Sequence, residues 1–365
     1  MPELSVSICI TVMNRLHHIK ETLSVNLLEN DSPGIEFILL DYNSNDSLDQ
    51  YIKTNFSQHL ETGRLIYYKC NTVQSFKRSH SRNMAFRLAT GDIVCNLDGD
   101  NYAGEDFGKY VQQIFSGGEN ICLTGLQNQW LHDASGKLCV RKSDFLEVTG
   151  YDENFEGYGF EDYDMVNRLF LSGCKPYTMN KKPFLRGIKH TNADRLIHDR
   201  YWQMLEDVYV HFIDASTSEL LYLFKDGKWR SATIINNYTF HSDLQDYSFV
   251  EKALETSQFK VKNGWNEGKW IFQEESLVLF HQTMMEVCNR SESGSQTIFE
   301  SKDHLYYHVA ENSLKLDAVS FYTQAANLFL MENNLAEKKI RVNKIFGNGT
   351  VYKNFEDDKP IVISN

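Results

Sequence analysis

The 365-residue chain is poor in proline, in cysteine motifs and in long apolar runs. It has only 5 Pro and 21 Gly, which excludes a collagen-like or proline-rich low-complexity protein. Its seven cysteines are scattered without a C-x-x-C pair, and the odd number argues against a disulfide framework, so we expect reduced thiols. The first apolar run, residues 5–12, is too short for a signal sequence or a membrane span. We therefore expect a cytoplasmic protein without a transmembrane segment, for which peripheral membrane association stays open.

Positive charge is also scarce. Lys and Arg number 37 against 49 Asp and Glu, which gives a formal charge of −12. An acidic surface disfavours binding to nucleic acid, and we expect no such partner. Any phosphate group of a ligand must therefore be held locally, by a few cations or by a metal ion.

The first hundred residues alternate between strand and helix patterns. Apolar runs at 5–12, 35–41, 64–69 and 92–97 predict strands, and residues 79–89 predict a helix that ends at Thr90-Gly91. This order indicates a doubly wound α/β domain.

The later part of the chain has a different pattern of apolar and turn-forming residues. Residues 195–213 show apolar side chains at helical spacing, and from about 215 short β-like runs alternate with turn signals. We expect a helix over 313–332 and a closing hairpin over 338–363 around Gly347. The predicted division is a domain over 1–213 and a smaller β-rich α+β module of open role over 214–365.

Two carboxylates stand one residue apart where the strand over 92–97 ends, at Asp98 and Asp100. Ligands of an open α/β sheet bind at the carboxyl ends of its strands, and such acids can hold a divalent cation that bridges a diphosphate. A D-x-D sequence alone is more often a polar turn. Here Asp41 ends another such strand, which favours a site.

Residues 156–164, Glu-Gly-Tyr-Gly-Phe-Glu-Asp-Tyr-Asp, lead into the start of a helix. Acids at this place can simply cap the helix, but the glycines permit close approach of a ligand, the aromatic rings can stack on a sugar, and a carboxylate can act as a general base. His190 is able to complete a metal site that Asp100 begins. Arg82 opens a helix at which an anion can bind.

These motifs, in this order, resemble the family-two inverting, metal-dependent glycosyltransferases of the GT-A fold, with a galactosyltransferase-like second half. The resemblance covers about residues 5–195. Its marks are, in chain order, Asn14-Arg15, Asp41 in LLDYNSND, Ser81-Arg82-Asn83, Asp98 and Asp100 in LDGDN, the segment GYDENFEGYGFEDYDMVNRL, and His190 in KHTN. It implies a Rossmann-like, nucleotide-sugar-binding domain followed by the β-rich module.

The resemblance also implies roles for individual residues. The nucleotide-sugar site would comprise Asn14, Arg15, Asp41, Arg82, Asp98 and Asp100. Within it, Asp41 would contact the base or ribose, and Asp98 the nucleotide sugar. Asp100 would bind Mn²⁺ or Mg²⁺, with His190 as the further metal ligand.

On the acceptor side, the resemblance implies that Asp162 is the catalytic base, that Glu161 orients the acceptor and shares in catalysis, and that Tyr158 stacks on the acceptor ring. Two positions depart from the family pattern. Gly187 replaces the methionine that galactosyltransferases of this kind carry three residues before the metal-binding histidine, and Phe160 replaces a small residue before Glu-Asp.

The predicted function is transfer of a hexose or N-acetylhexosamine, with inversion, from a UDP-linked nucleotide sugar to a hydroxyl of a glycan or lipid-linked saccharide, as in bacterial surface polysaccharide synthesis. A sugar nucleotidyltransferase is the rival enzyme, but it would show a glycine-rich phosphate loop where this chain reads MNRLHH. A non-catalytic carbohydrate-binding protein is the other alternative. The oligomeric state stays open.

Overall fold

The computed structural model describes residues 4–126, 136–179, 181–189, 191–214, 217–235, 261–293 and 296–364. The chain divides into two compact units. The first comprises Met1–Arg200 and Ala326–Asn365, and the second comprises Tyr201–Ala325.

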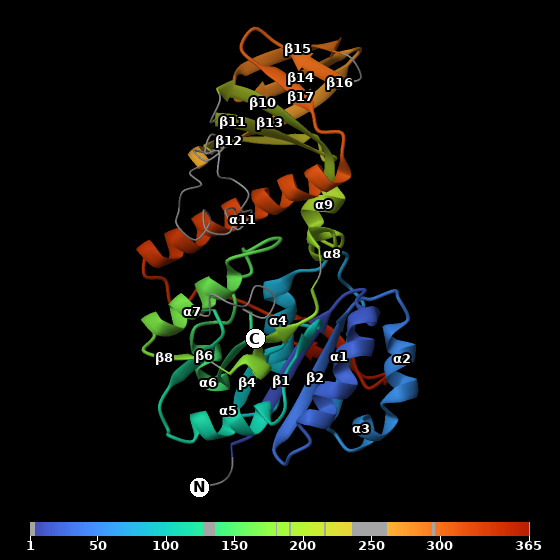
Figure 1. Cartoon of the computed structure of the whole chain (residues 1–365), viewed down its shortest axis with the longest axis vertical. Coiled ribbons are helices and arrows are strands. Elements are labelled where there is room, and N and C mark those ends of the chain that lie inside the picture. Colours follow the sequence, from blue (N-terminus) through green and yellow to red (C-terminus); the bar gives the residue numbers. More distant parts are fainter. Residues whose placement is uncertain are drawn as a thin grey trace. The chain divides into compact units, whose positions relative to one another are not determined.

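The first unit is an α/β domain (Figure 1). Its strands are β1 (Val6–Val12), β2 (Ile35–Tyr42), β3 (Leu65–Cys70), β4 (Ile93–Asn96), β5 (Asn101–Tyr102), β6 (Ile121–Thr124), β7 (Leu138–Arg141), β8 (Lys175–Thr178), β9 (Arg186–Gly187), β18 (Gly349–Lys353) and β19 (Pro360–Ile363). Its helices are α1 (Leu16–Glu29), α2 (Leu48–Asn55), α3 (Ser57–Glu61), α4 (Arg78–Leu88), α5 (Phe107–Phe115), α6 (Lys142–Glu147), α7 (Glu161–Leu171), the 3₁₀ helix η1 (Lys182–Leu185), α8 (Asn192–Leu196) and α9 (Arg200–Met204), whose later residues belong to the second unit.

One nine-stranded sheet organises this unit, in the order β19-β18-β3-β2-β1-β4-β7-β6-β8. Strands β3, β2, β1 and β4 run parallel, whereas β7 is antiparallel to β4. Because β1 is central and buried on both faces, its sequence, VSICITV, is mostly apolar. The α/β class that the sequence predicts is confirmed.

The two faces of the sheet carry separate apolar cores. The alternate residues Val6, Ile8, Ile10 and Val12 of β1 pack with α1, α2 and α5, while Cys9 faces the layer that contains α4, α6 and α7. This alternation follows from the two-residue period of a strand. The carboxyl ends of β1 and β4 therefore emerge between two helical layers, and the loops that follow them form the site described below.

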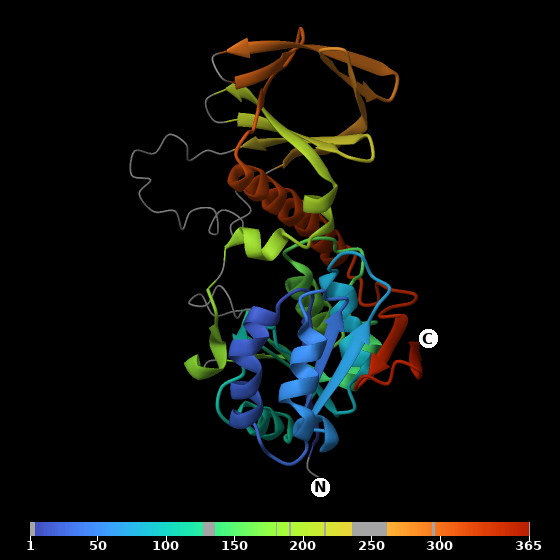
Figure 2. The same ribbon diagram turned by 90° about the vertical axis from the view of Figure 1, so that its right-hand side faces the viewer.

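The second unit is a closed barrel, and Figure 2 shows its strands as a ring. The strands are β10 (Leu205–Asp214), β11 (Thr217–Phe224), β12 (Lys228–Ile235), β13 (Val261–Gln273), β14 (Ser276–His281), β15 (Met284–Ser293), β16 (Gln296–Glu300) and β17 (Leu305–His308). Neighbours along the chain pair antiparallel, and β10 pairs with β17 to close the ring. The β-rich module is thus present, as the sequence predicts.

Three details differ from the sequence-based expectations. The helix expected over 195–213 is wrong for its second half, because Leu205–Asp214 form β10. This segment is rich in Val, Tyr, Phe and Ile, which favour a pleated strand despite their helical spacing. The closing hairpin is formed by β18 and β19, so its turn follows Lys353 and does not lie at Gly347.

The third difference concerns the end of the chain. The sequence places all of 214–365 in one module, whereas the compact units assign Ala326–Asn365 to the α/β domain. The physical reason is that β18 pairs antiparallel with β3 and extends the main sheet. Helix α11 (Asn312–Ala336) contains the second boundary between the units.

A buried polar network anchors the last turns of α11 in the α/β domain. The Asn334 amide, 1% exposed, donates to Asp152 Oδ2 and to Asp164 Oδ1, each at 2.9 Å. Asp164 also accepts from Arg168 Nε at 2.7 Å, and Arg168 donates to the carbonyls of Val148 and Gly150. Asp164 and Arg168 lie on α7, the helix that begins with the predicted catalytic pair.

In the part of the chain that the structure describes, no helix combines the length and the apolar character that a membrane span requires.

We expect Asn334→Ala to lower the free energy of unfolding of the α/β domain by about 2–4 kcal/mol, because two buried carboxylates would each lose a hydrogen bond. Asn333→Ala is the matched control, since its side chain is exposed on the same helix and the change in helix propensity is identical. Chemical denaturation followed by far-UV circular dichroism measures both. Equal effects of the two substitutions would contradict the anchoring role.

Candidate active site

A cavity of about 150 Å³ lies where β1 and β4 end. Asp98, Gly99 and Asp100 after β4, residues of α4, and the start of α7 line it. Its charged lining comprises the four guanidinium groups of Arg15, Arg78, Arg82 and Arg195 and the five carboxylates of Asp98, Asp100, Glu161, Asp162 and Asp199. Sequence motifs up to 147 residues apart, from Arg15 to Asp162, therefore meet in this cavity. The cavity lies at the edge of the sheet where open α/β folds bind ligands.

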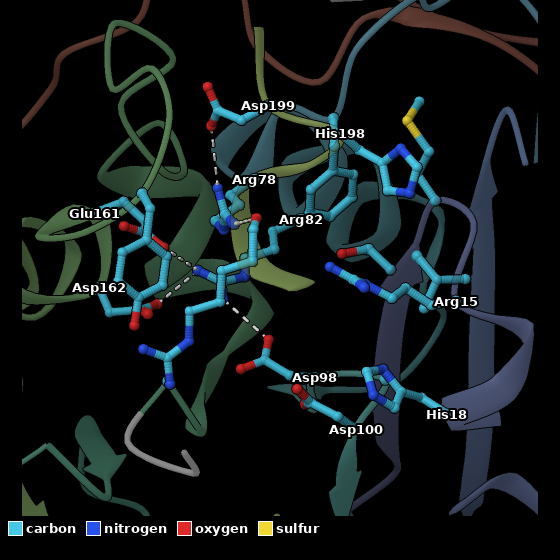
Figure 3. Close-up of a pocket in the computed structure, with 18 residues that line it drawn as sticks. Arg15, His18, Arg78, Arg82, Asp98, Asp100, Glu161, Asp162, His198 and Asp199 are labelled. Carbon is cyan, nitrogen blue, oxygen red and sulfur yellow. Dashed lines mark hydrogen bonds and ion pairs between the residues drawn. The ribbon is translucent and has the colours of Figure 1, made fainter. Parts of the chain in front are cut away.

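Arg82 is the centre of this arrangement (Figure 3). Its side chain is 6% exposed; Nη1 donates to Asp162 Oδ1 at 2.9 Å and to Glu161 Oε1 at 3.2 Å, and Nη2 donates to Asp98 Oδ1 at 3.0 Å. Burial alone would lower the pKa of Arg82, but the charges of Asp162 and Asp98 raise it well above its usual value. Arg82 is thus a permanent cation that joins the D-x-D turn to the start of α7.

The D-x-D turn is fixed by contacts on both sides. The Asn96 amide, at the end of β4, donates to Asp98 Oδ1 at 3.1 Å and to the carbonyl of Gly136 at 3.0 Å. A side chain at Gly99 would meet Val12 Cγ1 at 2.6 Å, so only glycine permits β1 and the turn to approach so closely. Asp100 accepts from its neighbour Asn101 at 2.7 Å.

The loop before α7 adopts an unusual backbone conformation. Gly157 and Gly159 have φ of 78° and 104°, which glycine adopts without strain, and Phe160 has a φ of 67°, which is costly for a large side chain. Two side chains hold backbone carbonyl groups of this loop by hydrogen bonds. Arg78 donates to Gly157 O at 2.7 Å, and Asn327 of α11 donates to Gly159 O at 2.9 Å.

The two acids at the start of α7 differ in their surroundings. Both oxygens of Glu161 are used within the protein, because Oε1 accepts from Arg82 and Oε2 accepts from the backbone N–H of Gly159 at 3.1 Å. Asp162 is 15% exposed and uses Oδ1 for Arg82. Burial raises the pKa of Asp162 to about 7, opposed by the charge of Arg82 and assisted by Glu161 and Asp98.

The predicted residues near the ends of β1 and β2 occupy different positions. Arg15 lines the cavity, and burial lowers its pKa from the usual value. Asn14 is adjacent, with its side-chain oxygen accepting from Asn45 N at 2.7 Å. Asp41 has no exposed surface, and its carboxylate accepts from Tyr67 Oη at 2.6 Å and Ser44 N at 2.7 Å. Asp41 is absent from the described lining, and its contact with a nucleotide stays a prediction.

Tyr158 lines the cavity, with the guanidinium groups of Arg78 and Arg195 5.0 and 5.3 Å from its ring centroid. Its stacking on an acceptor sugar stays a prediction.

His190, the second expected metal ligand, lies outside the described residues. Within the described ranges no group of three His, Cys, Asp or Glu side chains is placed to hold a metal ion. Asp98 and Asp100 provide adjacent oxygen donors of the kind that Mn²⁺ and Mg²⁺ accept.

Sequence reasoning missed three contributors to the site. A Cβ at Gly136 would lie 3.0 Å from Asp162 Oδ2 and 3.1 Å from Asp98 Oδ2, so glycine leaves room between the two carboxylates. Asn327 supports the loop at Gly159 from 168 residues away, and His198 contacts Asn14 with 3.5 Å between Nδ1 and Nδ2. A glycine in a turn and single polar residues far along the chain carry no local signal that could have identified them.

Two family models match consecutive parts of the chain. Residues 7–130 match glycosyl transferase family 2, and residues 124–191 match the N-terminal domain of galactosyltransferase. Among curated proteins, chondroitin sulfate synthase 3 of Homo sapiens is 30% identical over 76 residues, and its counterpart in Mus musculus is 40% identical over 48 residues. The matches cover 20% and 13% of this chain but only 9% and 5% of those proteins.

Similar solved structures include the mannosyltransferase PcManGT from Pyrobaculum calidifontis in complex with GDP-Man and Mn²⁺, with a TM-score of 0.43 and 15% identity over 54% of this chain and 63% of that chain. S. aureus TarS has a TM-score of 0.42 and 11% identity over 84% of this chain and 85% of its own. The two consecutive family matches agree with the order of motifs and with the geometry around Arg82. Over residues 7–191 the chain is therefore similar first to glycosyl transferase family 2 and then to the N-terminal domain of galactosyltransferase.

Proposed function

We propose that this chain is a metal-dependent, inverting glycosyltransferase. It moves a hexose or N-acetylhexosamine from a nucleotide sugar, most simply a UDP-sugar, to a hydroxyl of a glycan or lipid-linked saccharide. Asp162 is the catalytic base, Glu161 positions the acceptor loop, and the D-x-D turn with Arg15 receives the donor.

The observation that carries this proposal is the position of Asp162. Its carboxylate lines the same cavity as Asp98 and Asp100, and its pKa is raised to about 7. A general base works best when its pKa lies near the working pH, because it is then ionised and still basic enough to take a proton. A carboxylate that only capped α7 would gain nothing from such surroundings.

In the proposed reaction the acceptor oxygen forms a bond to the anomeric carbon while the bond from that carbon to the diphosphate oxygen breaks. The electron pair of the broken bond leaves with the nucleotide diphosphate, and the proton of the acceptor hydroxyl passes to Asp162. Attack from the face opposite the leaving group inverts the configuration. Neighbouring residues on a helix point about 100° apart, so Glu161 and Asp162 cannot both face the anomeric centre.

The diphosphate requires positive charge in a protein of net charge −12. The guanidinium group of Arg15 lines the cavity and suits a phosphate oxygen. Asp100, with His190, would hold the metal ion, which as a Lewis acid would stabilise the charge that develops on the leaving diphosphate, while Asp98 would contact the nucleotide sugar. The choices of a UDP-sugar as donor and of Mn²⁺ as metal rest on the similarity of residues 7–191 to the family-two glycosyltransferases and the galactosyltransferases.

We expect Asp162→Asn to lower the transfer rate by about 10²–10⁴-fold, because the acceptor proton loses its base, while the affinity for donor stays nearly unchanged. Glu161→Gln should keep measurable transfer at high acceptor concentration and raise the acceptor KM, since Glu161 bonds the loop through Gly159. Steady-state kinetics with varied acceptor, together with donor titration by calorimetry, separates the two. If Glu161→Gln abolished transfer and Asp162→Asn spared it, the assignment of the pair would be reversed.

We expect excess chelator to lower transfer by about 100-fold or more, because a bound cation supplies several kcal/mol of charge stabilisation. Asp100→Asn should likewise weaken binding of the nucleotide diphosphate in the presence of Mn²⁺ while leaving metal-free binding unchanged. The exposed Asp357→Asn is the control. Calorimetric titration with and without Mn²⁺ measures the difference, and full turnover in chelator would refute the metal requirement.

A further inference from the structure

The barrel of the second unit contains a cavity of its own. It measures about 570 Å³, within the range of small-molecule sites, and an eight-stranded barrel is wide enough to hold one small ligand. The lining side chains come from six of the eight strands and from the turn before β17. Because strand side chains alternate between faces, Glu219, Leu221 and Leu223 of β11 point to the same side, as do Trp229 and Ser231 of β12.

The inner wall of this cavity is apolar and aromatic. Trp229, Leu279 and Tyr306 line it and are 6%, 4% and 2% exposed. At the opposite extreme, Met284 and Met285 line the cavity with 68% and 64% of their surface exposed, so they belong to its mouth. The cavity therefore runs from a solvent-exposed rim to a buried aromatic wall.

Hydrogen-bonding groups converge on the same space. Glu286 Oε1 lies 2.7 Å from His304 Nδ1, and Glu219 Oε2 lies 3.7 Å from His304 Nε2, so one imidazole stands between two carboxylates. Glu219 is only 9% exposed, and among the described residues no lysine or arginine forms an ion pair with it. Burying a carboxylate such as that of Glu219 costs free energy unless it forms hydrogen bonds to a ligand or to neighbouring polar groups.

The hydroxyl group of Ser231 is the second, independent observation. It lines the cavity, its residue is 1% exposed, and it has no hydrogen-bond partner among the described residues. Buried polar groups in native proteins are nearly always paired, so an unpaired hydroxyl at the wall of a cavity indicates a partner that arrives with a ligand.

We propose that this barrel binds one saccharide unit of a glycan chain. A sugar presents several hydroxyl donors, which suit an array of carboxylate, serine and tyrosine oxygens, and an apolar ring face, which suits the indole of Trp229. That the glycan is the acceptor rests on the proposed function. A second saccharide site on the same chain raises the effective concentration of a long acceptor at the active site.

The test uses the full chain and an array of neutral, amino-sugar and uronic-acid oligosaccharides. Oligosaccharides that bind are then titrated by calorimetry against three variants. Ser231→Leu fills the cavity, Glu219→Gln removes one acceptor without changing shape, and Glu292→Gln changes an exposed carboxylate on β15. We expect the first two to raise the Kd by at least about tenfold, and the third to leave it unchanged.

Melting curves check that each variant is folded, and Glu219→Gln keeps the test decisive if Ser231→Leu is unstable. Binding should persist in Asp162→Asn, which alters only the active site. Absence of binding to every oligosaccharide, or binding that survives both cavity variants, would overturn the proposal. If saccharides bind in the barrel but no nucleotide sugar supports transfer, the proposed function fails while this inference stands.

Discussion

The Arg82 guanidinium, buried among Asp98, Glu161 and Asp162, is the interaction on which the site depends. It joins the turn after β4 to the first residues of α7, two segments that no strand pairing connects. Three carboxylates so close would repel one another, and one cation offsets only part of that repulsion. Burial raises the pKa of Asp162, and the charges of Glu161 and Asp98 add to this rise. The remaining negative charge also explains why a further cation would bind favourably beside the D-x-D turn.

The first half of the fold could be predicted because its signals are local. Buried parallel strands read as continuous apolar runs, and β1, β2, β3 and β4 lie within a residue or two of the expected ranges. Asp98, Asp100, Glu161 and Asp162 were also predictable as neighbours, because each follows a strand end or opens a helix at the same edge of the sheet. The order of the motifs in the sequence predicted a glycosyltransferase site, and the family matches agree with that prediction.

The remaining features depend on contacts between distant residues. Nothing near Gly349 in the sequence indicates that β18 pairs with β3, more than 280 residues earlier, or that Asn334 joins α11 to α7 through Asp164. The segment 205–214 carries both a helical spacing and a strand composition, and closure of the barrel by β17 decides between them. The barrel cavity likewise exists only once the ring closes, so Glu219 and Ser231 had no recognisable pattern.

The central claim is that Asp162, buried beside Arg82, is the base of the transfer reaction. The pH dependence of kcat/KM for the donor reports groups of the free enzyme. Asp162 accepts a proton only as a carboxylate, and its pKa is raised to about 7, so activity should be full above that pH and be lost below it. We predict that kcat/KM falls about tenfold for each pH unit below 7, and that the residual activity of Asp162→Asn lacks this limb. A profile of the unaltered enzyme that stays level from pH 8 to pH 5 would contradict the account.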